Sequence, residues 1–304
     1  MYLEHFGIRE APFSLTPDTS YFFASPSHQA ALNTLLVALR MGEGFIKVVG
    51  EVGTGKTLLC RKLLKILGDK YITAYIADPY LTPVQLRMAL AHELGIEMAP
   101  GSGQRQLNQV IHERLLGLSE TGKSVVLILD EAQALPNESL EALRLLTNLE
   151  TEKRKLLQIA IFGQPELDQR LAEPGMRQLR QRITFSHRLE TIEFDSLGDY
   201  VYHRLCQAGY QGRQPFTPKA LKLLHRASRG VPRLINVLTH KSLMAAFGRG
   251  TWKITPELVQ SAAHDTEGAT NQQFSLSSGA IVGLIGAASL LLAAALYYWM
   301  EVAG

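Results

Sequence analysis

Residues 45–57 read FIKVVGEVGTGKT and place a glycine-rich loop between two regular elements. The apolar run at 45–49 predicts a strand, and a helical pattern at 58–67 follows the loop. Residues 50–57 match the pattern G-x-x-x-x-G-K-[ST] in full, in the strand–loop–helix context where this pattern binds phosphate. The alternative is a glycine-rich turn before a helix that binds no phosphate, but this alternative does not explain why the whole pattern is matched.

The loop predicts a nucleotide site whose ligands are ATP and Mg²⁺. Glycines let backbone N–H groups surround a phosphate without clashes from Cβ atoms, and the N-terminus of the helix favours an anion. Lys56 is expected to reach the β- and γ-phosphates, and the Thr57 hydroxyl is expected to hold Mg²⁺. The predicted nucleotide-binding residues are Gly50, Glu51, Val52, Gly53, Thr54, Gly55, Lys56, Thr57 and Asp130.

An acidic pair, Asp130 and Glu131, follows the continuous apolar run at 124–129. A buried parallel strand typically has such a run, and ligands bind at the carboxyl ends of parallel strands. Asp130 is therefore expected in the magnesium shell with Thr57, and Glu131 is expected to polarise the attacking water. Asp130 could instead only cap the next helix. The second carboxylate favours hydrolysis over simple nucleotide binding.

Four further residues are weaker candidates for a catalytic role. Gln164 follows the apolar run at 156–162 and could touch the γ-phosphate or the water, or could be only a turn residue before Pro165. Arg180 and Arg182 could reach the nucleotide of a neighbouring subunit, or could belong to a solvated basic face. Arg233 could touch the γ-phosphate from a second domain, or could be an ordinary surface arginine.

Strand and helix patterns alternate up to about residue 190, and helical patterns alone follow. This order predicts an α/β domain with a mainly parallel sheet and then a small all-α lid domain. The expected divisions are an N-terminal segment at 1–25, the α/β nucleotide-binding domain at 26–190, the lid at 191–263, a linker at 264–278, a transmembrane helix at 279–300 and a periplasmic tail at 301–304.

Residues 279–300 read GAIVGLIGAASLLLAAALYYWM and contain no charged side chain. Twenty-two residues of helix are roughly 33 Å long, enough to cross the bilayer core, and the aromatic group at 297–299 suits a headgroup region. A buried core helix is the alternative. All 31 Lys and Arg precede this segment, so the body is expected in the cytoplasm and the C-terminus outside.

Composition excludes several other classes of protein. Of the 304 residues, 46% are hydrophobic, which excludes a disordered chain, and two cysteines are too few for a disulfide scaffold. The nine histidines are scattered, and no His/Cys group has the spacing of metal ligands. The net charge of only +3 does not favour a nucleic-acid partner.

These motifs together resemble the AAA+ ATPases, and more closely the general-secretion ATPases of the ExeA/GspA type. The resemblance covers about residues 1–265. The segments that carry it are the opening 1–18, Ser27-His28-Gln29-Ala30-Ala31-Leu32, Asp130-Glu131-Ala132-Gln133 and Gly163-Gln164-Pro165-Glu166-Leu167. The sequence of residues 44–64, GFIKVVGEVGTGKTLLCRKLL, is similar to that of the family member involved in biogenesis of the MSHA type IV pilus.

The resemblance implies a membrane-anchored ATPase of an envelope machine in the bacterial inner membrane. It implies a homo-oligomer such as a hexameric ring, together with pilus or secretion assembly proteins and membrane lipid as partners. It assigns the first sensor to Gln164, the finger to Arg180 or Arg182, and the second sensor to Arg233. Larger ExeA-type chains carry a periplasmic peptidoglycan-binding part, whereas only four residues follow position 300 here, so that activity is expected from a partner or not at all.

Two other functions remain open at this point. The same core resembles DNA-handling AAA+ modules of transposition and initiation, which bind DNA under the control of ATP. The near-balanced charge and the apolar segment at 279–300 speak against this reading. A nucleotide-sensing scaffold with little turnover is the other alternative, and Glu131 speaks against it.

Overall fold

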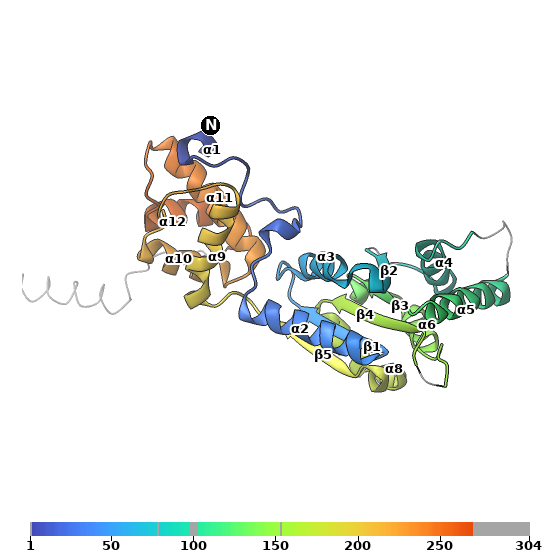
Figure 1. Ribbon diagram of the computed structural model, residues 1–304. Helices are drawn as coiled ribbons and strands as arrows, with labels where there is room; N and C mark the ends of the chain where they lie inside the picture. Colours follow the sequence, from blue (N-terminus) through green and yellow to red (C-terminus); the bar gives the residue numbers. More distant parts are fainter. Residues whose placement is uncertain (1, 78, 98–102, 153, 270–304) are drawn as a thin grey trace, which may run out of the picture.

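A computed structural model describes residues 2–77, 79–97, 103–152 and 154–269. Its sheet has five strands in the order β2-β3-β4-β1-β5, and all neighbouring strands are parallel (Figure 1). The predicted α/β fold with a parallel sheet is therefore confirmed. The strands are β1 (Phe45–Gly50), β2 (Tyr71–Ile76), β3 (Ser124–Leu129), β4 (Leu157–Gly163) and β5 (Phe185–Leu189).

Helices cover both faces of the sheet because the central strands are apolar on both sides. On β3, Leu127 and Leu129 face one layer while Val126 and Ile128 face the other. One face is covered by α2 (Pro26–Met41) and α3 (Lys56–Leu67). The other is covered by α4 (Pro83–Glu93), α5 (Gln104–Glu120), α6 (Asn137–Leu146), α7 (Pro165–Ala172) and α8 (Arg177–Arg182).

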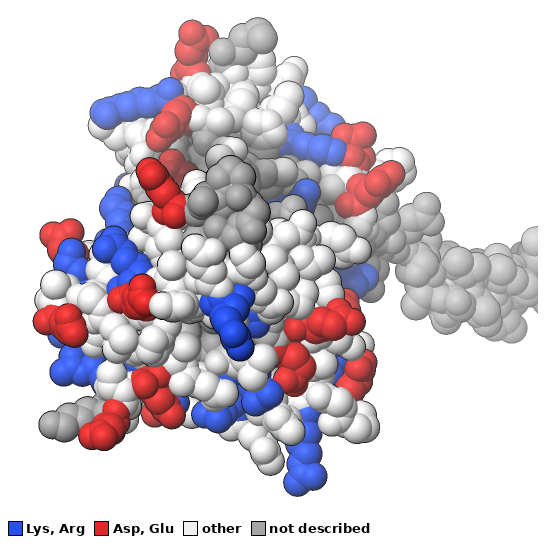
Figure 2. Space-filling view, turned by 90° about the vertical axis from the view of Figure 1, so that its right-hand side faces the viewer, with Lys and Arg blue, Asp and Glu red and all other residues white. Residues whose placement is uncertain are grey.

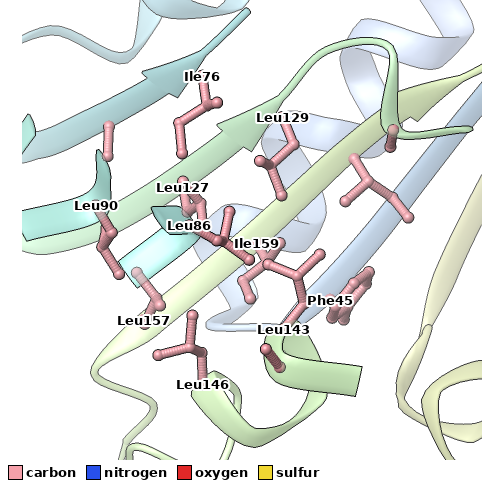
Figure 3. Packing of buried hydrophobic residues seen from close by; sticks show 14 of the residues in the cluster. Phe45, Ile76, Leu86, Leu90, Leu127, Leu129, Leu143, Leu146, Leu157 and Ile159 are labelled. Atoms are coloured by element: carbon pink, nitrogen blue, oxygen red, sulfur yellow. The ribbon is translucent and has the colours of Figure 1, made fainter. Parts of the chain in front are cut away.

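The core on the second face is built almost entirely from aliphatic side chains. Figure 3 shows Leu127 and Ile159 of the central strands meeting Leu86 and Leu90 of α4 and Leu143 of α6. All five are fully buried. A core of this kind holds the strand ends, and therefore the loops that follow them, in a fixed arrangement.

A second, all-helical domain follows the sheet and has a hydrophobic core of its own (Figure 1). Thr217 caps one of its helices by accepting a hydrogen bond from the Ala220 N–H, and proline occupies the next position. The helices are α9 (Phe194–Gln207), α10 (Pro218–Ser228), α11 (Pro232–Gly248) and α12 (Pro256–His264).

The N-terminal segment packs against this helical domain. It contains α1 (Tyr2–Phe6) and a short 3-10 turn, η1 (Thr19–Tyr21). Phe6, Ile8, Phe13 and Tyr21 are buried in the same core as α9–α12. The segment that the sequence separates as residues 1–25 is thus joined by its apolar side chains to a domain that begins about 170 residues later.

Arg204 of α9 holds the N-terminal segment to the helical domain. It is 5% exposed, and its Nε donates to the Pro12 carbonyl at 2.7 Å while Nη2 donates to the Ser14 carbonyl at 3.4 Å. The guanidinium also lies over the rings of Phe13 and Tyr21. On the other side, Arg61 of α3 donates to the Pro17 carbonyl at 2.7 Å. Residues 12–17 are therefore tied to both domains.

Most of the predicted linker, the predicted transmembrane helix at 279–300 and the predicted tail at 301–304 lie outside the described residues. Across the ranges that the structure describes, no helix is both long enough and apolar enough to cross a bilayer.

We predict that Arg204→Met lowers the free energy of unfolding by about 3 kcal/mol, since the buried Pro12 carbonyl loses a charged donor. Urea denaturation measures this loss, and limited proteolysis should show new cleavage between residues 9 and 18. Arg61→Met is the matched control, because this exposed arginine makes one similar bond to the same segment and should cost under about 1 kcal/mol. Equal losses in both variants would contradict the role given to Arg204.

Candidate nucleotide site

The glycine-rich loop connects the end of β1 to the start of α3 and turns sharply to do so. Gly53 has φ 81° and Gly55 has φ 98°, a backbone conformation that favours glycine. A Cβ atom at Gly50 would lie 2.7 Å from Thr54 Oγ1, and one at Gly53 would lie 2.7 Å from Arg233 Cβ. The loop therefore has its shape because side chains are absent at these positions, which lets a phosphate approach the backbone N–H groups closely.

Lys56 begins α3 and is only 5% exposed. Its Nζ donates to the carbonyl oxygens of Gly50 at 2.8 Å and Glu51 at 3.0 Å, both within the loop. Burial lowers the pKa of Lys56, and the charges of Glu131 and Asp130 oppose this lowering. The ammonium group is thus held at the loop by neutral acceptors that a phosphate can replace.

Thr57 and Asp130 form the oxygen pair that the sequence assigns to Mg²⁺. The Thr57 hydroxyl donates to Asp130 Oδ2 at 2.6 Å. Asp130 is 2% exposed, and burial raises its pKa, while the Thr57 hydroxyl and the Glu131 N–H act in the opposite direction. A hydroxyl and a carboxylate are the hard oxygen donors that Mg²⁺ accepts, so this pair fits the metal.

Glu131 sits directly after Asp130 in an unusual backbone conformation, with φ 51°. Its Oε2 accepts hydrogen bonds from Gln133 Nε2 at 2.6 Å and from Gln164 Nε2 at 3.1 Å. Burial alone would raise the pKa of Glu131, but these two bonds and the charge of Lys56 outweigh it and hold the pKa below its ordinary value. Glu131 is therefore ionised at neutral pH and can accept a proton.

A cleft of about 320 Å³ lies between the loop and the helical domain. The Arg233 N–H at the start of α11 donates to the Gly53 carbonyl at 3.1 Å, so the helical domain rests on the loop itself. Most of the predicted site lines this cleft, namely Val52, Gly53, Gly55, Lys56, Thr57, Glu131, Gln164 and Arg233. Gln164 reaches the site by bonding Glu131, a contact that the sequence does not specify.

Arg180 and Arg182 do not join the other candidates. Both lie exposed on α8, and neither belongs to the cleft lining of this subunit. A role at the nucleotide would have to be played on a neighbouring subunit.

The structure adds cleft residues that the sequence motifs do not indicate. The segment 14–18, Tyr200 and Asn236 form part of the wall, and the Tyr200 hydroxyl donates to Asn236 Oδ1 at 2.7 Å. They come from the N-terminal segment, α9 and α11. No local sequence pattern predicts these cleft residues, because only the packing of the two domains brings their segments to the loop.

His28 of α2 supports the loop from behind. Its Nε2 bonds the Thr54 carbonyl at 2.8 Å and its Nδ1 bonds Ser25 Oγ at 2.7 Å. A carbonyl only accepts, so Nε2 carries the proton, and in the neutral ring Nδ1 accepts from the Ser25 hydroxyl. Burial lowers the pKa of His28, which the bond to Thr54 opposes and nearby His187 reinforces. The ring is therefore neutral at pH 7.

We predict that His28→Phe reduces the dependence of stability on pH. Because the folded-state pKa of His28 lies below its ordinary value of 6.5, its contribution is present in full above pH 6.5 and is lost as pH falls toward the folded-state pKa. Unfolding free energies measured at pH 7.5 and 5.5 should differ less in the variant. Burial also lowers the pKa of His203 and His240, so part of the dependence should persist. An unchanged pH dependence would show that His28 does not titrate in this way.

Comparison with known proteins agrees with this geometry. Residues 39–171 match the model of the AAA domain family. The chain is 43% identical over 300 residues to general secretion pathway protein A of Aeromonas hydrophila, which covers 98% of this chain and 54% of that protein. The chain thus spans about half the length of this relative.

Solved structures share the fold at low sequence identity. Cdc6p from Pyrobaculum aerophilum has a TM-score of 0.64 at 21% identity, covering 90% of this chain and 73% of that one. The Thermotoga maritima RuvB Holliday junction branch migration motor has a TM-score of 0.54 at 16% identity, covering 80% and 70%. This chain is therefore similar to the AAA domain family over residues 39–171 and, over nearly its whole length, is a relative of general secretion pathway protein A.

Proposed function

We propose that this chain is an ATPase that uses ATP and Mg²⁺ to drive assembly of an envelope machine, in secretion or in biogenesis of a type IV pilus. The observation that carries the enzymatic part is that the buried Lys56, Thr57 and Glu131 line one cleft, while Asp130 accepts the hydrogen bond of Thr57. A protein that only binds nucleotide needs the lysine and the oxygen pair, whereas Glu131 adds the base that hydrolysis requires.

Each residue has a defined part in this proposal. The loop N–H groups and Lys56 bind the phosphates, and Thr57 with Asp130 holds Mg²⁺, which neutralises phosphate charge when bound. Glu131 accepts a proton from the attacking water, and Gln164 holds Glu131 in place. Arg233 belongs to the helical domain but lines the cleft, so occupancy of the cleft would influence how that domain sits on the loop.

Lys56→Ala is expected to abolish ATP binding, because it removes the ammonium group from the phosphate loop. Glu131→Gln should keep ATP binding and lower turnover by about a hundredfold or more, since the amide cannot accept the proton. Fluorescent-nucleotide binding and phosphate release measure the two effects separately. Wild-type turnover in Glu131→Gln would remove Glu131 from the catalytic role.

We also propose that the chain acts as a homo-oligomer in which Arg182 or Arg180 completes the site of the neighbouring subunit. Their exposure on α8, away from the cleft of their own subunit, supports this arrangement. It rests further on the resemblance to AAA+ proteins, where an arginine of one subunit commonly stabilises the transition state in the next.

Specific ATPase activity should therefore rise with protein concentration, and Arg182→Ala should lower turnover by about a thousandfold with little loss of nucleotide affinity. Sedimentation at the same concentrations identifies the oligomer. Constant specific activity in a protein that sediments as a monomer would rule out the arrangement.

The envelope role rests on the relationship to general secretion pathway protein A and on the apolar segment at 279–300. We propose that this segment anchors the ATPase to the inner membrane beside pilus or secretion assembly proteins. A DNA-binding role has less support. On the face shown in Figure 2, acidic and basic side chains are interspersed, whereas a DNA-binding face gathers basic ones.

Removing residues 279–304 should release the protein from the membrane fraction while ATP binding is retained, because the cleft lies wholly within residues 14–236. Membrane fractionation and nucleotide binding measure this. A reporter fused after residue 304 should be active only outside the cytoplasm. Activity of that reporter in the cytoplasm would overturn the proposed topology.

A further inference from the structure

Gln133 is the polar residue of the segment Asp130-Glu131-Ala132-Gln133 to which the proposed mechanism gives no role. It lies in the 3-10 turn η3 (Ala132–Ala134), two residues after Glu131, and is half-buried. Glu131 and Gln164 line the nucleotide cleft, but among the described lining residues Gln133 does not occur. Its side chain contacts these two lining residues without being part of the lining itself.

Both ends of the Gln133 amide are bonded, and their orientation follows from the partners. Oε1 accepts from the backbone N–H of Gln164 at 3.0 Å, and Nε2 donates to Glu131 Oε2 at 2.6 Å. A backbone N–H can only donate and an ionised carboxylate can only accept, so the amide fits in one orientation alone. The same side chain thus connects the loop after β3 with the turn after β4.

The main chain of Gln133 is also held. Arg170 of α7 donates from Nη1 to the Gln133 carbonyl at 2.7 Å and bonds Asn137 Oδ1 with its other terminal nitrogen. At Gly163, a Cβ atom would come within 3.3 Å of Gln133 Oε1, so the strand end leaves room for the amide. Gln133 is therefore placed by two neighbouring elements and does not depend on the nucleotide for its position.

We propose that Gln133 is the positioning residue for Glu131: it fixes the carboxylate in the orientation that receives the proton and ties it to the β4–α7 turn. The inference rests on the proposed ATPase function. Of the two hydrogen bonds that the described residues donate to the carboxylate, the longer one, from Gln164, remains without Gln133, and Gln164 loses the acceptor of its own backbone N–H. Removal of Gln133 therefore affects the Glu131 carboxylate in two ways, directly and through Gln164.

Gln133→Met tests the proposal, because methionine has nearly the same length but neither donates nor accepts strongly. We expect kcat to fall about tenfold while KM and the dissociation constant for ATP stay within about twofold, since Gln133 does not line the cleft. Gln109→Met is the matched control. Gln109 makes a similar 2.8 Å bond to a glutamate, Glu113, on the exposed face of α5, and this variant should match the wild type.

A second pair of variants separates positioning from general structural support. In a Glu131→Gln background, Gln133→Met should lower the residual turnover no further, since its effect passes through Glu131. Gln133→Glu keeps an acceptor for the Gln164 N–H but sets a negative charge beside Glu131, and it should also lower kcat. Additive losses in the double variant, or a wild-type kcat in Gln133→Met, would overturn the inference.

A crystal structure of Gln133→Met gives a readout that does not need turnover. The Glu131 carboxylate should leave its position beside Gln164 or become distributed over several rotamers. If the carboxylate keeps its wild-type position, the inference is wrong even where the protein hydrolyses ATP. If the carboxylate moves in the variant but the wild-type protein shows no ATPase activity, the ATPase proposal fails while the positioning of Glu131 by Gln133 stands.

Discussion

The hydrogen bond from Thr57 to Asp130 joins the start of α3, the helix that follows β1, to the residue after β3, a strand that is not a neighbour of β1 in the sheet, and the rest of the site depends on it. β4 lies between β1 and β3, so its register with each of them sets how far β1 and β3 extend relative to one another. Val49 pairs with Gly163, while Leu129 pairs with Ile161 two residues earlier. With this register the two residues after β3, Asp130 and Glu131, are level with the last two residues of β4, close to the end of β1. A shift of one residue would turn Asp130 to the opposite face and remove it from Thr57.

Much of this could be predicted from the sequence because the decisive signals are local. The loop and the acidic pair each lie within one stretch of chain, and each follows an apolar run that specifies a buried parallel strand. His28, Tyr200 and Asn236 could not be predicted, since their roles depend on segments far apart in sequence. His28 had a weak local signal, the Ser25-Pro26 start of a helix, which indicates a cap but not what the imidazole contacts. The role of Gln133 could not be predicted for the same reason, because its partner Gln164 follows the end of another strand.

The N-terminal segment is where sequence reasoning about domains and the three-dimensional arrangement differ most. Linear order separates residues 1–25 from the helices after 190, but burial of four apolar side chains joins them. Before the segment reaches α2, residues 12–17 lie between the two domains, and residues 14–17 line the cleft. Arg204 holds them from one domain and Arg61 from the other. A change in the angle between the domains therefore cannot leave this wall of the cleft unchanged, and a ligand bound in the cleft would be linked to the position of the domains.

The charges of the cleft show why such a link can be driven by nucleotide. Lys56 is buried with its ammonium on loop carbonyls, and burial lowers its pKa while the nearby carboxylates oppose this. A phosphate that takes the place of those carbonyls brings full negative charge to a buried cation, and an interaction of this kind is much stronger in a partly dry cleft than in water. The same loop bonds Arg233 through the Gly53 carbonyl and His28 through the Thr54 carbonyl. The backbone that would hold the phosphate is therefore also the backbone on which the helical domain rests, so a shift of this loop on hydrolysis would reach the second domain directly.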